Sequence, residues 1–241
     1  MIQVRVIGAG RAGRSFAAAI DALDDWDVLD MRGRGVPIEE AAHDVDLVLI
    51  ATPDAAIDDV ASAIEPGPAV VAHVAGSLGL DVLAPHERRA ALHPLMSLPE
   101  PEIGAQRLRG GWFAVAGDPI VTRLAAALDG RTFEIADDDR ALYHAAAAVA
   151  SNHLVALLGH ADRLGQAAGV PTEALLSLAL GSAENAAALG PAAALTGPAA
   201  RGDEATLDAH LTAIGRRAPR ELAAYEAMLA EARRLAAMEH E

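Results

Sequence analysis

The sequence predicts an α/β protein: an N-terminal Rossmann domain, built on a doubly wound and mainly parallel sheet, followed by an all-helical domain. Strand-like apolar runs alternate with helical patterns throughout the first half, which is typical of βαβ units. A G-x-G-x-x-G run at 8–13 follows the first strand directly. From about residue 137 the pattern is helical almost throughout. We therefore expect a nucleotide-binding domain over 1–136 and a helical substrate and dimerisation domain over 137–241.

The strands of the first half are recognised as short apolar or β-branched runs between turn signals. The run VDLVLIA at 45–51 is continuous and apolar, as expected for a strand buried on both faces of a sheet. Strands are expected at 3–7, 27–31, 45–51 and 69–74, weaker strands at 92–95, 112–115 and 132–135, and helices at 15–23 and 55–64.

Glycine and proline divide the second half into helices. Gly169 ends one long helical pattern, and Gly190-Pro191 closes the next. Helices are expected at 141–168, at 172–189, after a cap at Asp203, and from Pro219 to the end of the chain, with a loop over 192–202.

Composition excludes several classes of function. The formal net charge is −15, which repels phosphate backbones, so we expect no nucleic-acid partner. The chain has no Cys, and therefore no disulfide, thiolate metal site or Cys nucleophile. It also has no Lys, since all 19 basic residues are Arg, and a mechanism that needs a lysine ammonium group is excluded.

We expect neither a membrane segment nor a metal site. Strand-like residues begin at residue 2 with no basic stretch before them, unlike a signal peptide. No uninterrupted apolar run reaches the ~18–20 residues of a membrane span. His153 and His160 lie about 10.5 Å apart along a helix, too far to share a metal ion. No other cluster has metal-ligand spacing. A cytoplasmic protein is expected.

The run Gly8-Ala9-Gly10-Arg11-Ala12-Gly13 predicts a site for the pyrophosphate of a dinucleotide. Gly8 permits the tight turn, Gly10 lets the backbone approach the pyrophosphate, and Gly13 lets the helix pack against the strand. The start of the helix, with Arg11 and Ala12, offers free N–H groups and the positive end of a dipole. A glycine-rich turn that has lost its ligand is the alternative.

The residues DMRGR at 30–34 bear on the choice between NAD and NADP. Asp30 is the acidic residue that an NAD site uses for the ribose hydroxyls. Arg32 and Arg34 flank a glycine and would hold the 2′-phosphate of NADP in guanidinium forks. The sequence leaves open which residue ends the strand. The arginines favour NADP(H) over NAD(H), and a solvated surface charge is the alternative for Arg34.

Ala51, Thr52 and Pro53 lie at the carboxyl end of a predicted strand, beside the expected cofactor crevice. Their backbone is predicted to contact the nicotinamide ribose. Asp54 follows, and it is expected to cap the next helix, to face the crevice, or to do both.

Six segments spread over nearly the whole chain carry a resemblance to a known superfamily. They are GAGRAG at 8–13, TPD at 52–54, HVAGSLG at 73–79, HPL at 93–95, YHAAAAVASN at 143–152 and LTGPAARGD at 195–203. They resemble the 6-phosphogluconate dehydrogenase superfamily, and within it a poorly characterised family of Rossmann-like proteins near pyrroline-5-carboxylate reductase and alternative ketopantoate reductases. The resemblance implies a helical second domain that usually dimerises, and reduction of keto acids, imines or carbonyls with NADPH.

One feature departs from that superfamily. Several of its hydroxyacid dehydrogenases use a Lys four residues before an Asn on the first helix of the second domain. The candidate Asn is Asn152, and position 148 is Ala. Lys-dependent hydroxyacid chemistry is therefore disfavoured. Reduction of a protonated imine, which needs only hydride, is less demanding.

His144, Ala148, Ser151 and Asn152 are expected to share one face of the long helix, by 3.6-residue spacing. Ser151 and Asn152 are predicted to hold a carbonyl group or the nicotinamide amide, and His144 to donate a proton near neutral pH. About 12 Å of helix rise separates His144 from Asn152, so both cannot touch one reacting atom. A helix-packing role is the alternative for His144.

Ser77, His93 and Arg201 are predicted substrate contacts. Ser77 and His93 lie where loops should leave the carboxyl edge of the sheet, although His93-Pro94 is equally interpretable as a structural turn. Arg201, on a Gly- and Pro-containing loop, would bind a substrate carboxylate with two hydrogen bonds. An ion pair with Asp203 is the alternative.

Together these features predict an NADPH-dependent reductase of a small carboxylate-bearing carbonyl or imine compound, ketopantoate-like or pyrroline-carboxylate-like. A homodimer through the helical half is expected, because Ala- and Leu-rich helices need a surface on which to bury their apolar faces. The missing Lys motivates a second hypothesis, a non-catalytic NADP(H)-binding sensor or scaffold dimer. A structural dimer without nucleotide binding is a third, which the intact glycines disfavour.

Overall fold

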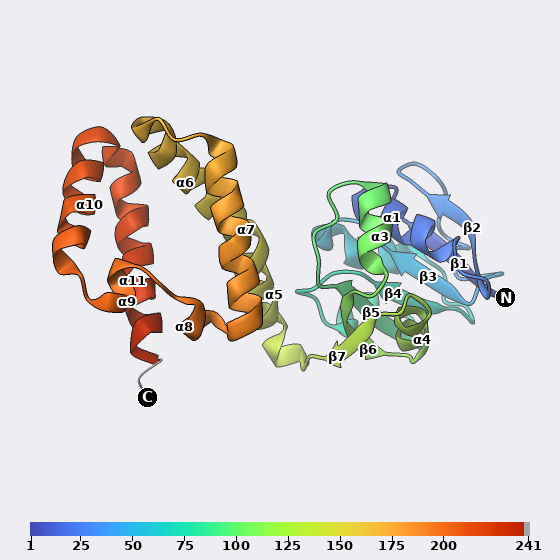
Figure 1. The fold of residues 1–241 in the computed structure, drawn as a ribbon. Coiled ribbons are helices and arrows are strands. Elements are labelled where there is room, and N and C mark those ends of the chain that lie inside the picture. The colour runs from blue at the N-terminus through green and yellow to red at the C-terminus, as the bar shows by residue number, and fades with distance from the viewer. Residues whose placement is uncertain (239–241) are drawn as a thin grey trace. The chain divides into compact units, whose positions relative to one another are not determined.

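The computed structural model describes residues 1–238 of the chain. These form two compact units, one over Met1–Ser151 and the other from Asn152 onward (Figure 1). The change to a helical sequence pattern comes earlier, at residue 137, where the last strand of the sheet has just ended.

The first unit is built on a seven-stranded sheet in the order β2-β1-β3-β4-β5-β6-β7. Neighbouring strands pair in parallel except β5 with β6, which are antiparallel. The strands are β1 (Ile2–Ile7), β2 (Trp26–Arg32), β3 (Leu47–Ile50), β4 (Val70–His73), β5 (Arg89–Pro94), β6 (Trp112–Gly117) and β7 (Arg131–Glu134). The predicted doubly wound and mainly parallel sheet is confirmed, weaker strands included.

Apolar side chains cover both faces of this sheet. One core combines β1, β3 and β5 with residues of three helices, α1 (Arg11–Ile20), α3 (Pro101–Leu108) and α4 (Ile120–Ala127). The other core, on the opposite face, includes α2 (Ile57–Ala63) and the 3₁₀ turn Leu80–Leu83. All four residues of β3 are fully buried, as its uninterrupted apolar sequence predicts.

Two of these helices, α3 and α4, are absent from the sequence prediction. Each is only eight residues long, so its local pattern is weak. Tertiary packing stabilises these two helices, which their helix propensity alone would not. A Cβ on Gly104 of α3 would lie 2.0 Å from Ser15 Oγ of α1, so the glycine permits the close approach of the two helices.

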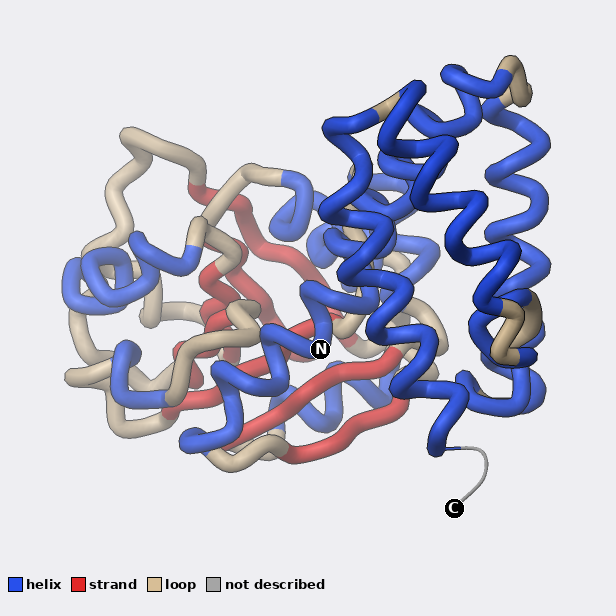
Figure 2. The backbone as a smooth tube through the Cα atoms, turned by 90° about the vertical axis from the view of Figure 1, so that its left-hand side faces the viewer, coloured by secondary structure: helices blue, strands red, loops and turns tan. Residues whose placement is uncertain are grey.

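The second unit consists of helices joined by loops, without the strands drawn in red in the first (Figure 2). The helix α5 (Arg140–Ala148) still belongs to the first unit, and the π-helical turn after it (Val149–His153) spans the boundary between the units. The further helices are α6 (Leu154–Ala168), α7 (Thr172–Leu189), α8 (Pro191–Ala194), α9 (Pro198–Arg201), α10 (Glu204–Arg217) and α11 (Leu222–Met238).

The helical half corrects two predictions and confirms a third. The continuous α-helix expected over 141–168 is interrupted by the π turn, so 3.6-residue spacing does not carry through it. The loop expected over 192–202 contains the one-turn helices α8 and α9, each beginning with Pro at a position where its missing N–H is harmless. The Asp203 cap is confirmed, because its carboxylate accepts the Thr206 N–H at 3.1 Å.

The second unit buries little of its own apolar surface. Among its described residues, the buried hydrophobic residues are Leu207 and Ile214, both on α10. Within α7 and α11 no residue is buried. Leu178 and Leu180 of α7 are each 68% exposed. Such helices lack the apolar cover that normally stabilises them.

One part of the chain passes the length and composition test for a membrane span, contrary to the expectation that none would. The helical stretch 137–168 contains a window of mean hydropathy 1.3, and none of that window is buried. Strict runs of apolar residues miss this segment because polar residues such as Ser151 and Asn152 interrupt it.

Candidate functional site

The phosphate loop lies between β1 and α1, at the carboxyl edge of the sheet. Gly8 has φ +112°, and a Cβ there would lie 2.6 Å from Ala51 O. A Cβ on Gly13 would lie 1.9 Å from Gly8 O, whereas a Cβ on Gly10 would meet nothing within 4 Å. Gly8 and Gly13 are therefore required by the fold, and Gly10 faces open space. The fold therefore needs Gly8 and Gly13 as the sequence predicts, whereas the approach of a pyrophosphate at Gly10 stays a prediction.

The first turn of α1 is open toward that space. Gly10 is the N-cap residue of α1, in extended conformation, and no side chain caps the helix. The N–H groups of Arg11 and Ala12 belong to this first turn, and the Arg11 side chain is exposed. An uncapped first turn beside open backbone is a ready site for an anion.

The strand order places β1 between β2 and β3, so the chain reverses its direction of winding between β1 and β3. Ligands of open α/β sheets bind at such a switch point, at the carboxyl ends of the strands. Ala51 and Thr52 follow β3 there, and Thr52 Oγ1 is buried without a hydrogen-bond partner among the described residues. A buried hydroxyl without a partner is costly, which indicates that a polar group is missing beside it.

The end of β2 resolves which residue ends the strand. Arg32 is its last residue, and the Gly8 N–H donates to Arg32 O at 2.9 Å. The Arg32 guanidinium donates to Pro37 O at 2.8 Å and lies 3.4 Å from Asp30 Oδ2. Arg34 is exposed in the following turn. A basic side chain therefore occupies the position where an NAD site has its acid.

Asp30 has a structural partner. Its Oδ1 accepts a hydrogen bond from Arg5 Nε at 2.8 Å, and Arg5 is buried. The same guanidinium donates to Ala41 O at 2.8 Å and His43 O at 3.0 Å. Asp30 thus neutralises a buried charge that joins β1 to the loop before β3.

Asp54 does not cap a helix, so this prediction is wrong. It lies inside the 3₁₀ turn Asp54–Ala56, whose N-cap residue is Pro53. Its Oδ2 accepts the Ser77 hydroxyl at 2.8 Å instead. The loops after β3 and β4 therefore meet through polar side chains at the carboxyl edge of the sheet.

His93, near the carboxyl end of β5, lies against the loop that follows β4. A Cβ on Gly76 would lie 2.8 Å from both Cε1 and Nε2 of the His93 ring, so only glycine fits beside it. His93 Nδ1 is 2.6 Å from the hydroxyl of Tyr143 on α5, and the two rings meet edge to face at 5.5 Å. The His144 ring lies 6.2 Å from that of His93.

Burial and neighbouring charges set the protonation of this group. Burial, with the His144 charge as the next cause, lowers the pKa of His93 to about 4. Burial raises the pKa of Tyr143 to about 12. At neutral pH both side chains are uncharged, and Tyr143 keeps its proton.

His73, the last residue of β4, is fully buried behind this edge. Its Nδ1 accepts the Ala75 N–H at 3.2 Å, so Nε2 carries the proton and donates to Gly79 O at 3.2 Å. Burial lowers the pKa of His73. Both ring nitrogens are used by backbone groups, which gives His73 a role in shaping the loop.

The remaining predicted site residues lie apart from this edge in the sequence. Ser151 and Asn152 fall in the π turn, and Ser151 Oγ donates to Ala147 O at 2.7 Å. Arg201 is exposed at the end of α9. Asp203 uses both carboxylate oxygens on Thr206, and Arg201 contributes only a lesser lowering of the Asp203 pKa.

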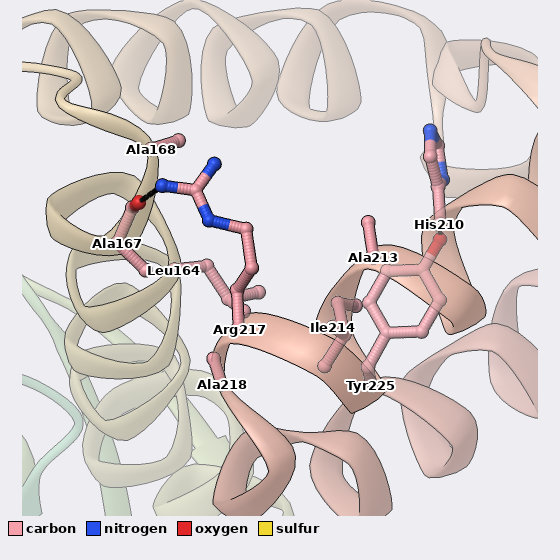
Figure 3. Close-up of a pocket in the computed structure, with 9 residues that line it drawn as sticks. All are labelled: Leu164, Ala167, Ala168, His210, Ala213, Ile214, Arg217, Ala218 and Tyr225. Atoms are coloured by element: carbon pink, nitrogen blue, oxygen red, sulfur yellow. Dashed lines mark hydrogen bonds between the residues drawn. The ribbon is translucent and has the colours of Figure 1, made fainter.

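A second hollow lies within the helical unit (Figure 3). It has a volume of about 270 Å³ and is lined almost entirely by apolar atoms of Leu164, Ala167, Ala168, His210, Ala213, Ile214, Arg217, Ala218 and Tyr225. Arg217 donates to Ala167 O near the end of α6, where a cation is favourable to the helix dipole. On the other side, His210 Nδ1 is 2.7 Å from the Tyr225 hydroxyl.

Sequence reasoning missed Tyr143 and Gly76. Tyr143 is the first residue of the segment YHAAAAVASN, in which the sequence analysis predicts the neighbouring His144 as the proton donor. Its distance of fifty residues from His93 hides the contact from any local pattern. No group of three His, Asp or Glu side chains suited to a metal ion occurs among the described residues.

The family model "Domain of unknown function (DUF2520)" matches residues 114–232. A comparison with curated proteins gave no match. Among solved structures, the chain is similar to a protein from Thermotoga maritima, with 23% identity, 99% of this chain and 100% of that chain covered, and a TM-score of 0.75.

Two further solved structures are similar over nearly their whole length. One is a putative NADP oxidoreductase from Bacteroides fragilis, with 18% identity, 97% and 98% coverage of this chain and that chain, and a TM-score of 0.80. The other is pyrroline carboxylate reductase from Plasmodium falciparum with NADP bound, with 14% identity, 98% coverage of both chains and a TM-score of 0.63. These findings confirm the predicted resemblance, and at this identity the structures show the shared fold.

Proposed function

We propose that this protein is an NADPH-dependent reductase of a small carboxylate-bearing carbonyl or imine compound. The observation that carries the proposal is the incomplete polar site at the β1/β3 switch point. There an open glycine loop, an uncapped helix start and the unpartnered Thr52 hydroxyl converge. The names of the similar structures, a putative NADP oxidoreductase and a pyrroline carboxylate reductase, support the same class of reaction.

The residues present fit a dinucleotide. Backbone N–H groups of 10–13 would hold the pyrophosphate, and Ala51, Thr52 and Pro53 would contact the nicotinamide ribose. Arg32 and Arg34 would bind a 2′-phosphate, for which the position at the end of β2 is suited. Asp30 is engaged by Arg5, which favours NADP(H) over NAD(H).

When bound, the reduced nicotinamide supplies hydride. Residues of the first unit at the same edge would bind and orient the substrate. Ser77, held by Asp54, and His93, held against Gly76, are the proposed substrate contacts on the sheet side. Ser151, Asn152 and His144 are proposed from the helical stretch, and Arg201 as a ligand for the substrate carboxylate. In a chain of net charge −15, an anion needs such a local cation.

NADPH oxidation with a panel of small acids tests this function. The panel contains ketopantoate and 1-pyrroline-2-carboxylate as probes, with their decarboxylated analogues as matched controls. We expect turnover of a carboxylate-bearing probe and a rise in KM for its decarboxylated analogue. No NADPH oxidation with any acid would contradict the reductase function.

We also propose that the protein is a cytoplasmic homodimer through its helical unit. The exposed leucines of α7, the apolar window of 137–168, of which none is buried, and the Ala-lined hollow of Figure 3 are apolar surfaces that a second copy would cover. Small Ala side chains permit a partner helix to approach closely. Sedimentation equilibrium should give twice the monomer mass of 24.8 kDa, and a monomer at micromolar concentration would contradict the proposal.

A non-catalytic NADP(H)-binding sensor or scaffold dimer is the second candidate. The absence of Lys from the whole chain favours it, because a common proton donor of related hydroxyacid dehydrogenases is missing. It predicts NADPH binding and dimerisation without oxidation of NADPH by any acid in the panel.

A further inference from the structure

The proposed reduction of a carbonyl needs a proton donor, for which the sequence analysis predicts His144. Hydride addition to a carbonyl carbon leaves charge on oxygen, which a positioned acid must neutralise. No lysine is available. The donor must therefore be sought among the titratable groups at the carboxyl edge of the sheet, where the cofactor is proposed to bind.

Several groups at this edge already have their protons committed. The Ser77 hydroxyl donates to Asp54. His73 uses both ring nitrogens on backbone groups behind the edge. Arg140 is buried and donates to Asp137 at 2.6 Å. The groups left to consider are the paired side chains of His93 and Tyr143, and the exposed ring of His144.

The Tyr143 ring is held in place from two directions. The Phe133 ring of β7 meets it edge to face at 5.7 Å, and the His93 ring meets it at 5.5 Å. His93 is itself fixed, because its ring lies against the Gly76 backbone with no room for a Cβ. The hydroxyl of Tyr143 is thus carried on a rigid ring and held at 2.6 Å by His93 Nδ1.

The direction of that hydrogen bond decides what the pair can do. If Nδ1 carries the ring proton, it donates to Tyr143 Oη and leaves the phenol O–H free to turn toward a ligand. If Nε2 carries the ring proton, the phenol O–H donates to Nδ1 and is not available to a ligand. Both ring nitrogens lie close to Gly76, since Nε2 is 2.8 Å and Nδ1 3.0 Å from where a Cβ would lie. Only the first arrangement supplies both a free acid and a donor that stabilises the phenolate.

We propose that Tyr143 is the catalytic acid of this protein, that His93 is its positioning residue through an Nδ1–H donor, and that the pair selects an unprotonated carbonyl substrate, a keto acid. The proposal rests on the proposed reductase function and adds to it the identity of the donor and of the substrate class. Tyr143 replaces His144 as the acid, and His144 remains a neighbouring contact.

In the proposed step, the bound cofactor would supply hydride to the carbonyl carbon, and the π electron pair of the C=O bond would move to oxygen. That oxygen takes the proton of Tyr143 Oη, and the phenolate left behind is stabilised by His93 Nδ1–H until solvent returns a proton. The carbonyl is reduced to an alcohol, and the nicotinamide is oxidised. A protonated imine needs no such acid, because hydride alone completes its reduction.

The kinetic test compares Y143F with Y225F. Tyr225 is the only other tyrosine, and it pairs with His210 in nearly the same geometry, at 2.7 Å and 86°. We expect Y143F to lower kcat for ketopantoate by about 100-fold or more, the usual effect of a lost general acid. Turnover of 1-pyrroline-2-carboxylate in its protonated form should change little, and Y225F should be unaltered with both probes. Equal losses on both probes, or none, would overturn the assignment.

Substitutions at His93 test positioning without touching the acid. The Asn amide in H93N can place an N–H near the position of Nδ1, whereas H93F cannot donate. We expect H93N to keep most of kcat and H93F to lose it. Equal activity of H93N and H93F would contradict the positioning role.

A spectroscopic readout is independent of turnover. ¹⁵N NMR at neutral pH should show His93 as the neutral Nδ1–H tautomer, and the Nδ1 resonance should move in Y143F but not in Y225F. A His93 ring protonated on Nε2 would overturn the proposal even if the enzyme is active.

NADPH binding, measured by thermal shift on the same variants, distinguishes failure of the proposed function from failure of the donor assignment. Absence of binding to the wild-type protein would remove the proposed function itself. Intact binding and wild-type turnover of ketopantoate by Y143F would overturn only the donor assignment.

Discussion

The two units of this chain differ in how they obtain a hydrophobic core. The first unit buries its apolar residues on both faces of a seven-stranded sheet. The second buries few of its described residues, and α7 and α11 bury none. A sheet flanked by helices completes itself within one chain, whereas this set of helices does not. This difference is why we propose a ligand site on the first unit and a partner surface on the second.

Two His–Tyr pairs sharpen the same comparison. His93–Tyr143 and His210–Tyr225 have hydrogen bonds of 2.6 and 2.7 Å and ring planes at 86° in both cases. The first lies at the carboxyl edge of the sheet and the second lines an apolar hollow between helices. Identical local chemistry therefore gives different proposed roles, and only the surroundings distinguish them.

The largest effect is expected at Gly13. In G13A the new Cβ would lie 1.9 Å from Gly8 O, a backbone atom that cannot move without distorting the loop. We expect a loss of about 3 kcal/mol of stability or failure to fold, at the upper end of overpacking costs. Urea unfolding measures this change.

G10A is the matched control for G13A. A Cβ on Gly10 meets nothing, and its φ of −79° suits alanine, so stability should stay within about 1 kcal/mol of wild type. NADPH binding should nevertheless weaken, because the Cβ enters the space proposed for the pyrophosphate. A G10A variant that binds NADPH normally would contradict the proposed site.

The next effect is on assembly. Leu178 is 68% exposed on α7, so L178D should hardly change the folding of a monomer. In a dimer the carboxylate would be buried without a partner, at a cost of about 3 kcal/mol. Analytical ultracentrifugation should show dissociation. L29D, on the exposed side of β2 in the first unit, serves as the control and should stay dimeric.

Cofactor preference should respond to the arginines after β2. We expect the double variant R32A/R34A to weaken NADPH binding by about 10- to 100-fold, the cost of lost charged hydrogen bonds, and to leave NADH binding nearly unchanged. D30N should reduce stability instead, because it leaves buried Arg5 without its counter-charge. Calorimetric titration with both nucleotides checks the first expectation, and parallel losses for NADPH and NADH would contradict it.

A pH dependence of stability is also expected. His93 has a pKa of about 4 when folded and about 6.5 when unfolded, because burial and the charges of His144, His73 and Arg140 oppose its protonation, while Asp54 partly favours it. The unfolded chain therefore binds the extra proton first, and stability should fall as pH decreases from about 6.5 to about 4. H93N should show a shallower fall over this window in pH-dependent urea titrations. An identical slope would contradict the shifted pKa.

The sequence predicts the sheet well because its signals are local. The run at 45–51 is apolar throughout since both faces are covered, and the glycines at 8, 10 and 13 have roles that follow from their spacing. The short helices α3 and α4 escape prediction because packing against the sheet and α1, such as Gly104 on Ser15, decides them.

The candidate site is less predictable for a physical reason. Ser77 and His93 are found from their place after strands, but their partners Asp54 and Tyr143 come from distant parts of the chain. Asp54 shows the limit of predicting helix caps from residue type, because its carboxylate accepts the Ser77 hydroxyl and caps no helix. The π turn at Val149–His153 likewise depends on context that 3.6-residue spacing cannot register.

Thermal stabilisation by NADPH, NADP, NADH and NAD at matched concentrations tests the central claim most directly. A nucleotide at ~100 times its Kd should add about 2.7 kcal/mol of stability. We predict a clear shift with NADPH and NADP, a smaller one with NADH and NAD, and loss of the NADPH shift in G10A. No shift with any nucleotide would contradict the assignment of the β1/β3 edge as a dinucleotide site.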